Sequence, residues 1–96
     1  MMAGINPFFS LIVPFKDEED TLTVMVREIN EAFGAVTYDW EVIWIDDGST
    51  DKSVSTIESL TKMQPWHNLI RLSQNYGQSA ALSIGFKRAR GQIVGT

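Results

Sequence analysis

Residues able to bind a ligand gather directly behind an apolar segment in the middle of the chain. Residues 40–45 are largely apolar and end abruptly in two adjacent carboxylates, Asp46 and Asp47, which Gly48 follows. A short run of this kind, rich in aromatic and β-branched residues, predicts a buried strand. In open α/β sheets, ligands bind outside the carboxyl ends of the strands. The pair of acids therefore predicts a ligand site at the end of this strand.

The residues after the acid pair have a second interpretation. Ser49, Thr50 and Asp51 could simply form the turn and cap the next helix, since Ser, Thr and Asp are preferred capping residues. Asp46 and Asp47 fit that role less well, because two adjacent like charges are more than a cap needs. Both interpretations stay open for residues 49–51.

Hydrophobic periodicity predicts an alternation of strands and helices along the chain. The expected strands are residues 8–14, 41–45, 68–73 and a fourth that begins at 92–96. The expected helices run over about 17–34, 51–63 and 77–90, with the acids of residues 17–20 in the first turn of the first helix and Phe86 facing inward. This order favours right-handed crossovers and a parallel sheet, so the predicted fold class is α/β.

Composition excludes several classes of function. The chain carries 12 acidic against 8 basic residues, a net charge of -4, which argues against nucleic acid as the main partner. It has no cysteine, so a disulfide framework or thiolate metal site is impossible. The longest apolar runs, Pro7 to Phe15 and Val42 to Ile45, are far shorter than the roughly 20 residues of a membrane helix.

The compartment is expected to be cytoplasmic. Residues 1–4 lack the basic region of a secretory signal. His67 follows a Pro-Trp pair and is expected to be a loop or strand-edge residue without a catalytic role.

Three loops are expected to meet at the carboxyl edge of the sheet: residues 14–19, 46–50 and 73–78. The first is acidic where a dinucleotide enzyme would carry Gly-x-Gly-x-x-Gly, so it would repel a diphosphate placed there. Its carboxylates could accept hydrogen bonds from a base edge or ribose hydroxyls, and they suit a metal that neutralises the diphosphate elsewhere. The third loop offers amides, a ring and a glycine, although it could be a simple helix entry capped by Asn75.

Together these motifs resemble the family-two glycosyltransferases of the GT-A fold. The similarity runs from about Phe9 to Thr96 and is strongest to the branch that includes dolichol-phosphate mannosyltransferase and the bactoprenol glucosyltransferases. It rests on the segments Pro14-Phe15-Lys16-Asp17-Glu18-Glu19, Ile45-Asp46-Asp47-Gly48-Ser49-Thr50-Asp51 and Asn75-Tyr76-Gly77-Gln78-Ser79-Ala80-Ala81-Leu82, followed by Gly85, Ala89 and Gly91. It departs at Phe15-Lys16-Asp17, where the family usually has an aliphatic residue, an aromatic residue and Asn.

The resemblance implies a fold and a nucleotide-sugar site. The fold would be the Rossmann-like, nucleotide-binding half of a GT-A domain, with three layers and a parallel sheet ordered 3-2-1-4. Pro14 and Glu18 match positions that line the nucleotide pocket, Asp47 matches the acid that contacts the base, and Gln78 matches a further nucleotide contact. Asp46 is expected to have a turn role. The family's Asp-x-Asp motif for Mg²⁺ or Mn²⁺ follows the fourth strand, so metal ligands are expected just after Thr96, and no catalytic residue is expected within residues 1–96.

The implied function is inverting transfer of a sugar from a nucleoside-diphosphate sugar to an acceptor, most simply a polyprenyl phosphate at the cytoplasmic face of a membrane. Residues 1–96 would be the amino-terminal part of this glycosyltransferase domain, incomplete at the carboxyl end and inactive alone. Apolar Ile93 and Val94 on an edge strand would favour self-association.

Two other classes of function stay open as alternatives. The chain could be a non-catalytic module that binds a nucleotide or a partner. A receiver-type signalling domain is disfavoured, because its acid pair follows strand one and its phosphate-accepting Asp ends strand three, where this chain has Ser73 and Gln74.

Overall fold

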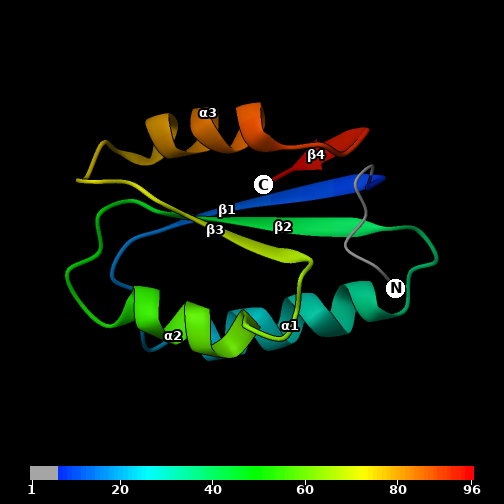
Figure 1. The fold of residues 1–96 in the computed structure, drawn as a ribbon, viewed down its shortest axis with the longest axis horizontal. Helices are drawn as coiled ribbons and strands as arrows, with labels where there is room; N and C mark the ends of the chain where they lie inside the picture. Colours follow the sequence, from blue (N-terminus) through cyan, green and yellow to red (C-terminus); the bar gives the residue numbers. More distant parts are fainter. Residues whose placement is uncertain (1–6) are drawn as a thin grey trace.

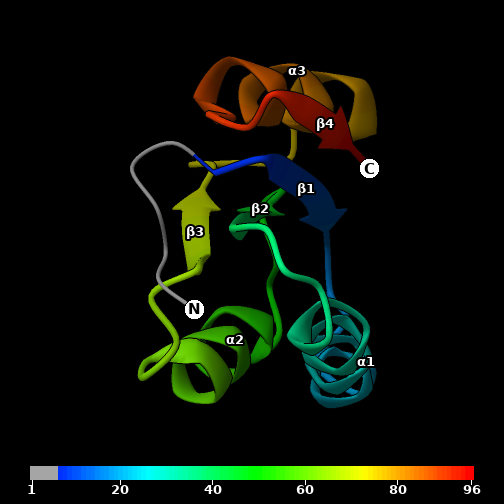
Figure 2. The same cartoon turned by 90° about the vertical axis from the view of Figure 1, so that its right-hand side faces the viewer.

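The computed structural model describes residues 7–96 as three layers, with a parallel sheet between two layers of helices (Figures 1 and 2). Helix α3 covers one face, and α1 and α2 cover the other. The elements are β1 (Phe9–Phe15), α1 (Leu22–Gly34), β2 (Trp40–Asp46), α2 (Ser53–Thr61), β3 (His67–Arg71), α3 (Gln78–Arg88) and β4 (Ile93–Gly95). The strand order is β3-β2-β1-β4, which confirms the predicted class and order.

The register of the sheet brings the ends of its strands level. Phe15 of β1 lies beside Asp46 of β2, which in turn lies beside Arg71 of β3. Every residue of β2 is buried, because this strand has a neighbour on each side and helices on both faces. The three loops that follow β1, β2 and β3 therefore leave the sheet at the same edge.

Alternate residues of β1 and β2 face two separate hydrophobic cores. Trp44 packs with Leu22 and Ile57 beneath α1 and α2. On the opposite face Ile12 and its neighbours pack against α3. The approach of α3 is close because Gly85 has no side chain: a Cβ there would overlap the side chain of Ile12.

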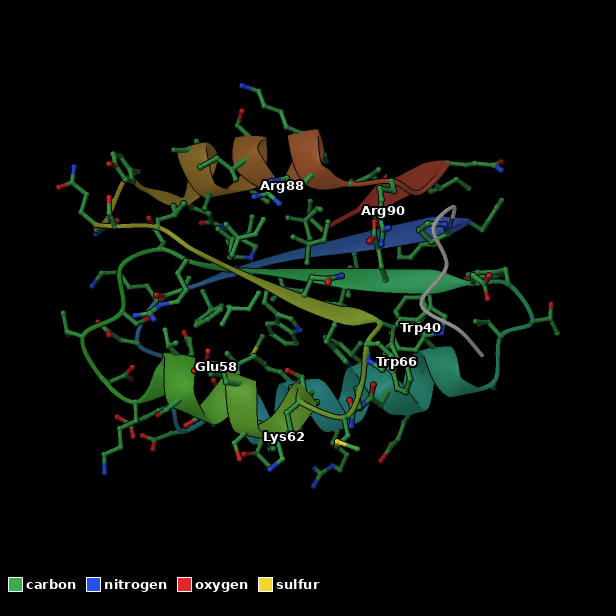
Figure 3. The ribbon with its side chains drawn as sticks, viewed as in Figure 1. Trp40, Glu58, Lys62, Trp66, Arg88 and Arg90 are labelled. Atoms are coloured by element: carbon green, nitrogen blue, oxygen red, sulfur yellow. The ribbon has the colours of Figure 1, made fainter. Side chains whose placement is uncertain are left out.

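A buried carboxylate ties the amino end of the sheet together. Glu41 of β2 accepts hydrogen bonds from the Ser10 hydroxyl (2.6 Å) and the Arg90 backbone N–H (2.9 Å). The Arg90 guanidinium, which Figure 3 places between the α3–β4 connection and the sheet, also reaches Glu41 Oε1 at 2.9 Å. Burial would raise the pKa of Glu41, but these hydrogen bonds and the Arg90 charge lower it. The cluster thus joins β1, β2 and the entry to β4.

Several boundaries differ from those expected. The acids of residues 17–20 precede α1, which begins at Leu22, and Asp17 among them accepts N–H groups of the neighbouring loop. Strand β1 continues through Pro14 to Phe15. Pro14 has no backbone N–H to donate, but no hydrogen bond to β4 is lost, because β4 pairs only with residues 9–11. Phe86, expected to face inward, is 48% exposed on the outer side of α3.

Strand β4 lies at the edge of the described sheet, as expected, and Ile93 is half exposed there. Self-association through this edge stays a prediction. No helix within residues 7–96 is long and apolar enough to cross a membrane, and residues 1–4, considered above as a possible signal, lie outside the described part.

His67 begins the edge strand β3, yet it is buried in a polar network. The Trp44 indole N–H donates to His67 Nδ1 (2.9 Å), so the other ring nitrogen carries the proton and lies 2.9 Å from Asn30 Oδ1. Asn30 Oδ1 also accepts the Trp66 indole N–H, and Trp66 packs edge-on against Trp40 (Figure 3). A neutral imidazole completes this network, and burial lowers the pKa of His67 to about 4.

We expect the stability of the protein to fall as the pH falls from 6.5 toward 4. In this pH window His67 binds a proton in the unfolded state but stays neutral in the folded state. A fall in pH therefore favours the unfolded state. Urea denaturation at pH 7.5, 6 and 5 measures the effect. In His67→Phe, stability at pH 7.5 should be lower because Trp44 loses its acceptor, but the slope between pH 7.5 and 5 should flatten. An unchanged slope in this variant would contradict the assignment.

Candidate functional site

A pocket of about 320 Å³ opens at the carboxyl edge of the sheet. Its lining residues come from the end of β1, the loops after β1 and β2, and the start of α3: Pro14, Phe15, Lys16, Glu18, Asp47 and Gln78. The four residues expected to bind a nucleotide, Pro14, Glu18, Asp47 and Gln78, are thus brought together. Their contact with a ligand stays a prediction.

Asp17 joins the first loop to the second. Its backbone is left-handed (φ 53°), a conformation that Asp adopts more readily than most residues. This turns its carboxylate toward the second loop, where Oδ1 accepts the backbone N–H groups of Thr50 (2.7 Å) and Asp51 (3.3 Å). Oδ2 accepts a hydrogen bond from Lys16 Nζ (3.0 Å). The Thr50 N–H and Lys16 lower the pKa of Asp17.

Further hydrogen bonds run in the opposite direction, from the first loop to the second. The Asp17 N–H donates to Ser49 Oγ (2.9 Å), and the Glu18 N–H donates to the buried Ser53 Oγ (2.7 Å). Asp51 Oδ1 accepts the Ser53 N–H (2.8 Å) at the start of α2. Burial opposes ionisation of Asp51, but the Ser53 hydrogen bonds lower its pKa. Residues 49–51 therefore hold the turn and the helix entry.

The acid pair has divided roles. Asp46 Oδ1 accepts the Ser49 N–H (3.0 Å), which is the expected turn role. Asp47 is 6% exposed and reaches the third loop, where its two oxygens accept the N–H groups of Tyr76 (2.8 Å) and Gly77 (3.1 Å).

Gly48 lets the third loop pass close to the second. It has φ 79°, and a Cβ there would lie 2.6 Å from the Asn75 nitrogen. Asn75, considered as a helix cap, instead accepts the Gly77 N–H (3.0 Å), and Gly77 itself precedes α3.

The residues described here do not form a metal site. Within residues 7–96 no group of three or more His, Cys, Asp or Glu side chains could hold a metal ion. The carboxylates of Asp17, Asp47 and Asp51 accept backbone N–H groups from neighbouring loops. These hydrogen bonds give the acids at this edge a structural role in joining the loops.

The charges around the pocket limit which ligand groups it can accept. Lys16 supplies one positive charge, while Glu18 and Asp47 supply two negative charges. A diphosphate would be repelled by this balance, whereas ribose hydroxyls and a base could donate hydrogen bonds to the carboxylates. The arrangement suits the nucleoside end of a ligand.

Two further lining residues, Phe15 and Lys16, were not among the four expected contacts, although both lie where the sequence departs from the family pattern. The tie made by Asp17 was not expected either. A signal was available, because Lys16 and Asp17 lie in the same loop as the expected Pro14 and Glu18.

The fold and the pocket define an α/β domain with a pocket at the carboxyl edge of a parallel sheet. Residues 10–96 match the model of "Glycosyl transferase family 2". The chain belongs to this family.

Two relatives illustrate the match. The "undecaprenyl-phosphate 4-deoxy-4-formamido-L-arabinose transferase" of Pseudomonas fluorescens is 35% identical over 87 residues, which are 88% of this chain and 25% of the relative. The "dodecaprenyl-phosphate galacturonate synthase" of Rhizobium johnstonii is 32% identical over 88 residues, which are 91% of this chain and 26% of the relative. The chain spans about a quarter of the length of the curated relatives it matches.

Solved structures show the same fold. The mannosyltransferase PcManGT from Pyrobaculum calidifontis, in complex with GDP-Man and Mn²⁺, has a TM-score of 0.79 and 25% identity, covering 96% of this chain and 27% of that one. S. aureus TarS 1-349 in complex with UDP-GlcNAc has a TM-score of 0.78 and 22% identity, covering 93% of this chain and 26% of that one. The described sheet is thus the GT-A, Rossmann-like arrangement.

We expect Asp17→Ala to loosen the junction of the first two loops. The Thr50 and Asp51 amides lose their shared acceptor, so their hydrogen exchange should accelerate severalfold. Asp17→Asn keeps one side-chain oxygen and should retain most of the protection. Asp20→Ala, an exposed acid in the same loop, is the matched control. Equal exchange rates in Asp17→Ala and Asp20→Ala would show that the tie is absent in solution.

Proposed function

We propose that residues 1–96 are the amino-terminal, nucleotide-sugar-binding part of an inverting glycosyltransferase. Its donor would be a nucleoside-diphosphate sugar and its acceptor a polyprenyl phosphate. The observation that carries the proposal is the single pocket where Pro14, Glu18, Asp47 and Gln78 meet at the carboxyl edge of the sheet. Family membership and the named activities of the polyprenyl-phosphate relatives support the reaction.

In this proposal the pocket holds the nucleoside and leaves the diphosphate outside. Asp47 is fixed by two backbone N–H groups, and its remaining lone pairs accept hydrogen bonds from the base. Glu18 is exposed at the pocket and can accept from ribose hydroxyls, while the Gln78 amide offers both a donor and an acceptor. Pro14 and Phe15 add apolar surface. Rigid loops keep these groups in place before the ligand arrives.

The transfer would be an in-line displacement at the anomeric carbon. An oxygen of the acceptor phosphate forms the new bond to this carbon, and the bond to the diphosphate breaks with its electron pair on the departing oxygen. A phosphate acceptor is already an anion, so it needs little help from a general base. The reaction would take place at the cytoplasmic face of a membrane, which the protein would contact through regions beyond Thr96.

A divalent cation, Mg²⁺ or Mn²⁺, would stabilise the charge of the departing diphosphate. The described residues do not fit such an ion, so we propose that its ligands follow Thr96. The PcManGT structure, which contains Mn²⁺, supports a divalent cation in this fold.

The decisive experiment is a transfer assay with the full-length protein. It is incubated with a panel of nucleoside-diphosphate sugars, a polyprenyl phosphate and Mg²⁺ or Mn²⁺, and the lipid fraction is analysed by mass spectrometry. We expect a polyprenyl-phosphate sugar from at least one donor. Nucleotide binding without transfer from any donor would favour the alternative, a non-catalytic nucleotide-binding module. Failure to bind any nucleotide would refute both.

Within the same protein, we expect Asp47→Ala to weaken nucleoside-diphosphate binding by on the order of tenfold or more. It removes a charged acceptor at the pocket and also frees the Tyr76 and Gly77 amides. Asp51→Ala should have a much smaller effect, because Asp51 holds the start of α2 and does not line the pocket. Isothermal titration measures both affinities, and equal losses would show that Asp47 acts only through loop structure.

A further inference from the structure

Lys16 is the only cationic side chain among the described residues that line the pocket. Its side chain is 40% exposed, and Nζ lies 3.0 Å from Asp17 Oδ2. The hydrogen bond to Asp17 and the Asp17 charge raise the pKa of Lys16, with smaller contributions from Asp47 and Asp51. An ammonium group at this position stays charged and can only donate hydrogen bonds.

Asp17 is built to hold this ammonium in place. One carboxylate oxygen is engaged with the second loop, and the other is the one that faces Lys16. An asparagine could make the first contact through its carbonyl, but its amide nitrogen could not accept from a lysine. Lys16 and Asp17 therefore form a matched donor and acceptor pair in the first loop.

The pair leaves hydrogen-bonding capacity for a ligand. An ammonium carries three N–H donors, and within residues 7–96 Lys16 Nζ has one hydrogen-bond partner, Asp17. Asp47, on the same pocket, is an acceptor only. The pocket thus combines a charged donor from the first loop with a charged acceptor from the second.

A base edge with an N–H next to a carbonyl complements this combination. Uracil and guanine have such an edge, because a ring N–H adjoins a carbonyl oxygen. Adenine has no carbonyl oxygen, and the carbonyl of cytosine adjoins no ring N–H. We propose that Lys16 is a specificity-determining residue: it donates to the base carbonyl and selects uridine or guanosine diphosphate sugars over those of adenosine and cytidine. This inference rests on the proposed function of the pocket.

The test is isothermal titration of the full-length protein with UDP, GDP, ADP and CDP. The wild type should bind UDP or GDP at least about tenfold more tightly than ADP and CDP, as expected for one hydrogen bond to a charged group. Lys16→Met keeps the apolar stem and should largely remove this preference while retaining residual binding. Lys16→Arg keeps a charged donor and should retain it.

Lys52→Met is the matched control, since Lys52 is exposed on the neighbouring loop and does not line the pocket. This variant makes the same change in charge and should leave the preference intact. Circular dichroism and the melting temperature of each variant separate a folding defect from a binding defect. If Lys16→Met does not fold, Lys16→Gln takes its place.

The outcomes separate this inference from the function on which it rests. If the wild type prefers uracil or guanine and Lys16→Met keeps that preference, Lys16 is not the selector, although the nucleotide site stands. A wild-type preference for ADP or CDP likewise overturns only the inference. If the wild type binds none of the four nucleotides, both the proposed function and the role of Lys16 are refuted.

Discussion

The candidate site depends on carboxylates that accept backbone N–H groups across loop boundaries. Asp17 ties the first loop to the second, and Asp47 ties the second loop to the third. Hydrogen bonds to charged groups are stronger than those between neutral ones, and the two bonds to Asp47 are also partly buried. Three loops that are far apart in the sequence are thereby joined at one edge of the sheet, where the pocket lies.

The sheet positions these three loops. Strand β2 is buried along its whole length between β1 and β3, and its register brings Phe15, Asp46 and Arg71 level. The opposite end is secured by Glu41, which binds Ser10 and Arg90 and so holds the approach to β4. Strand β2 therefore has a buried acid near each end. Asp47 follows the strand and joins the loops of the site, whereas Glu41 joins β2 to β1 and to the entry of β4.

The acids at the carboxyl edge of the sheet have a structural role. Asp17 and Asp47 accept backbone N–H groups from neighbouring loops, and the described residues contain no group of three or more side chains that could hold a metal ion. What remains for a ligand is a small pocket with one cation and two carboxylates. This balance of charge favours hydrogen-bond donors of a ligand over a second anion.

The sequence alone determined the alternation of strands and helices, the parallel sheet and the edge at which polar residues gather. These follow from hydrophobic period, from turn residues and from the rule that ligands meet the carboxyl ends of parallel strands. It also singled out Pro14, Glu18, Asp47 and Gln78, through motifs whose residues are close together in the chain. Only the tertiary structure decided which atoms each acid binds. The left-handed turn at Asp17, the reach of Asp47 to Tyr76, and the burial of His67 beside Trp44 all join residues more than twenty positions apart. Local patterns carry no information on such pairings, because they arise only when the register of the sheet brings distant loops and strands into contact.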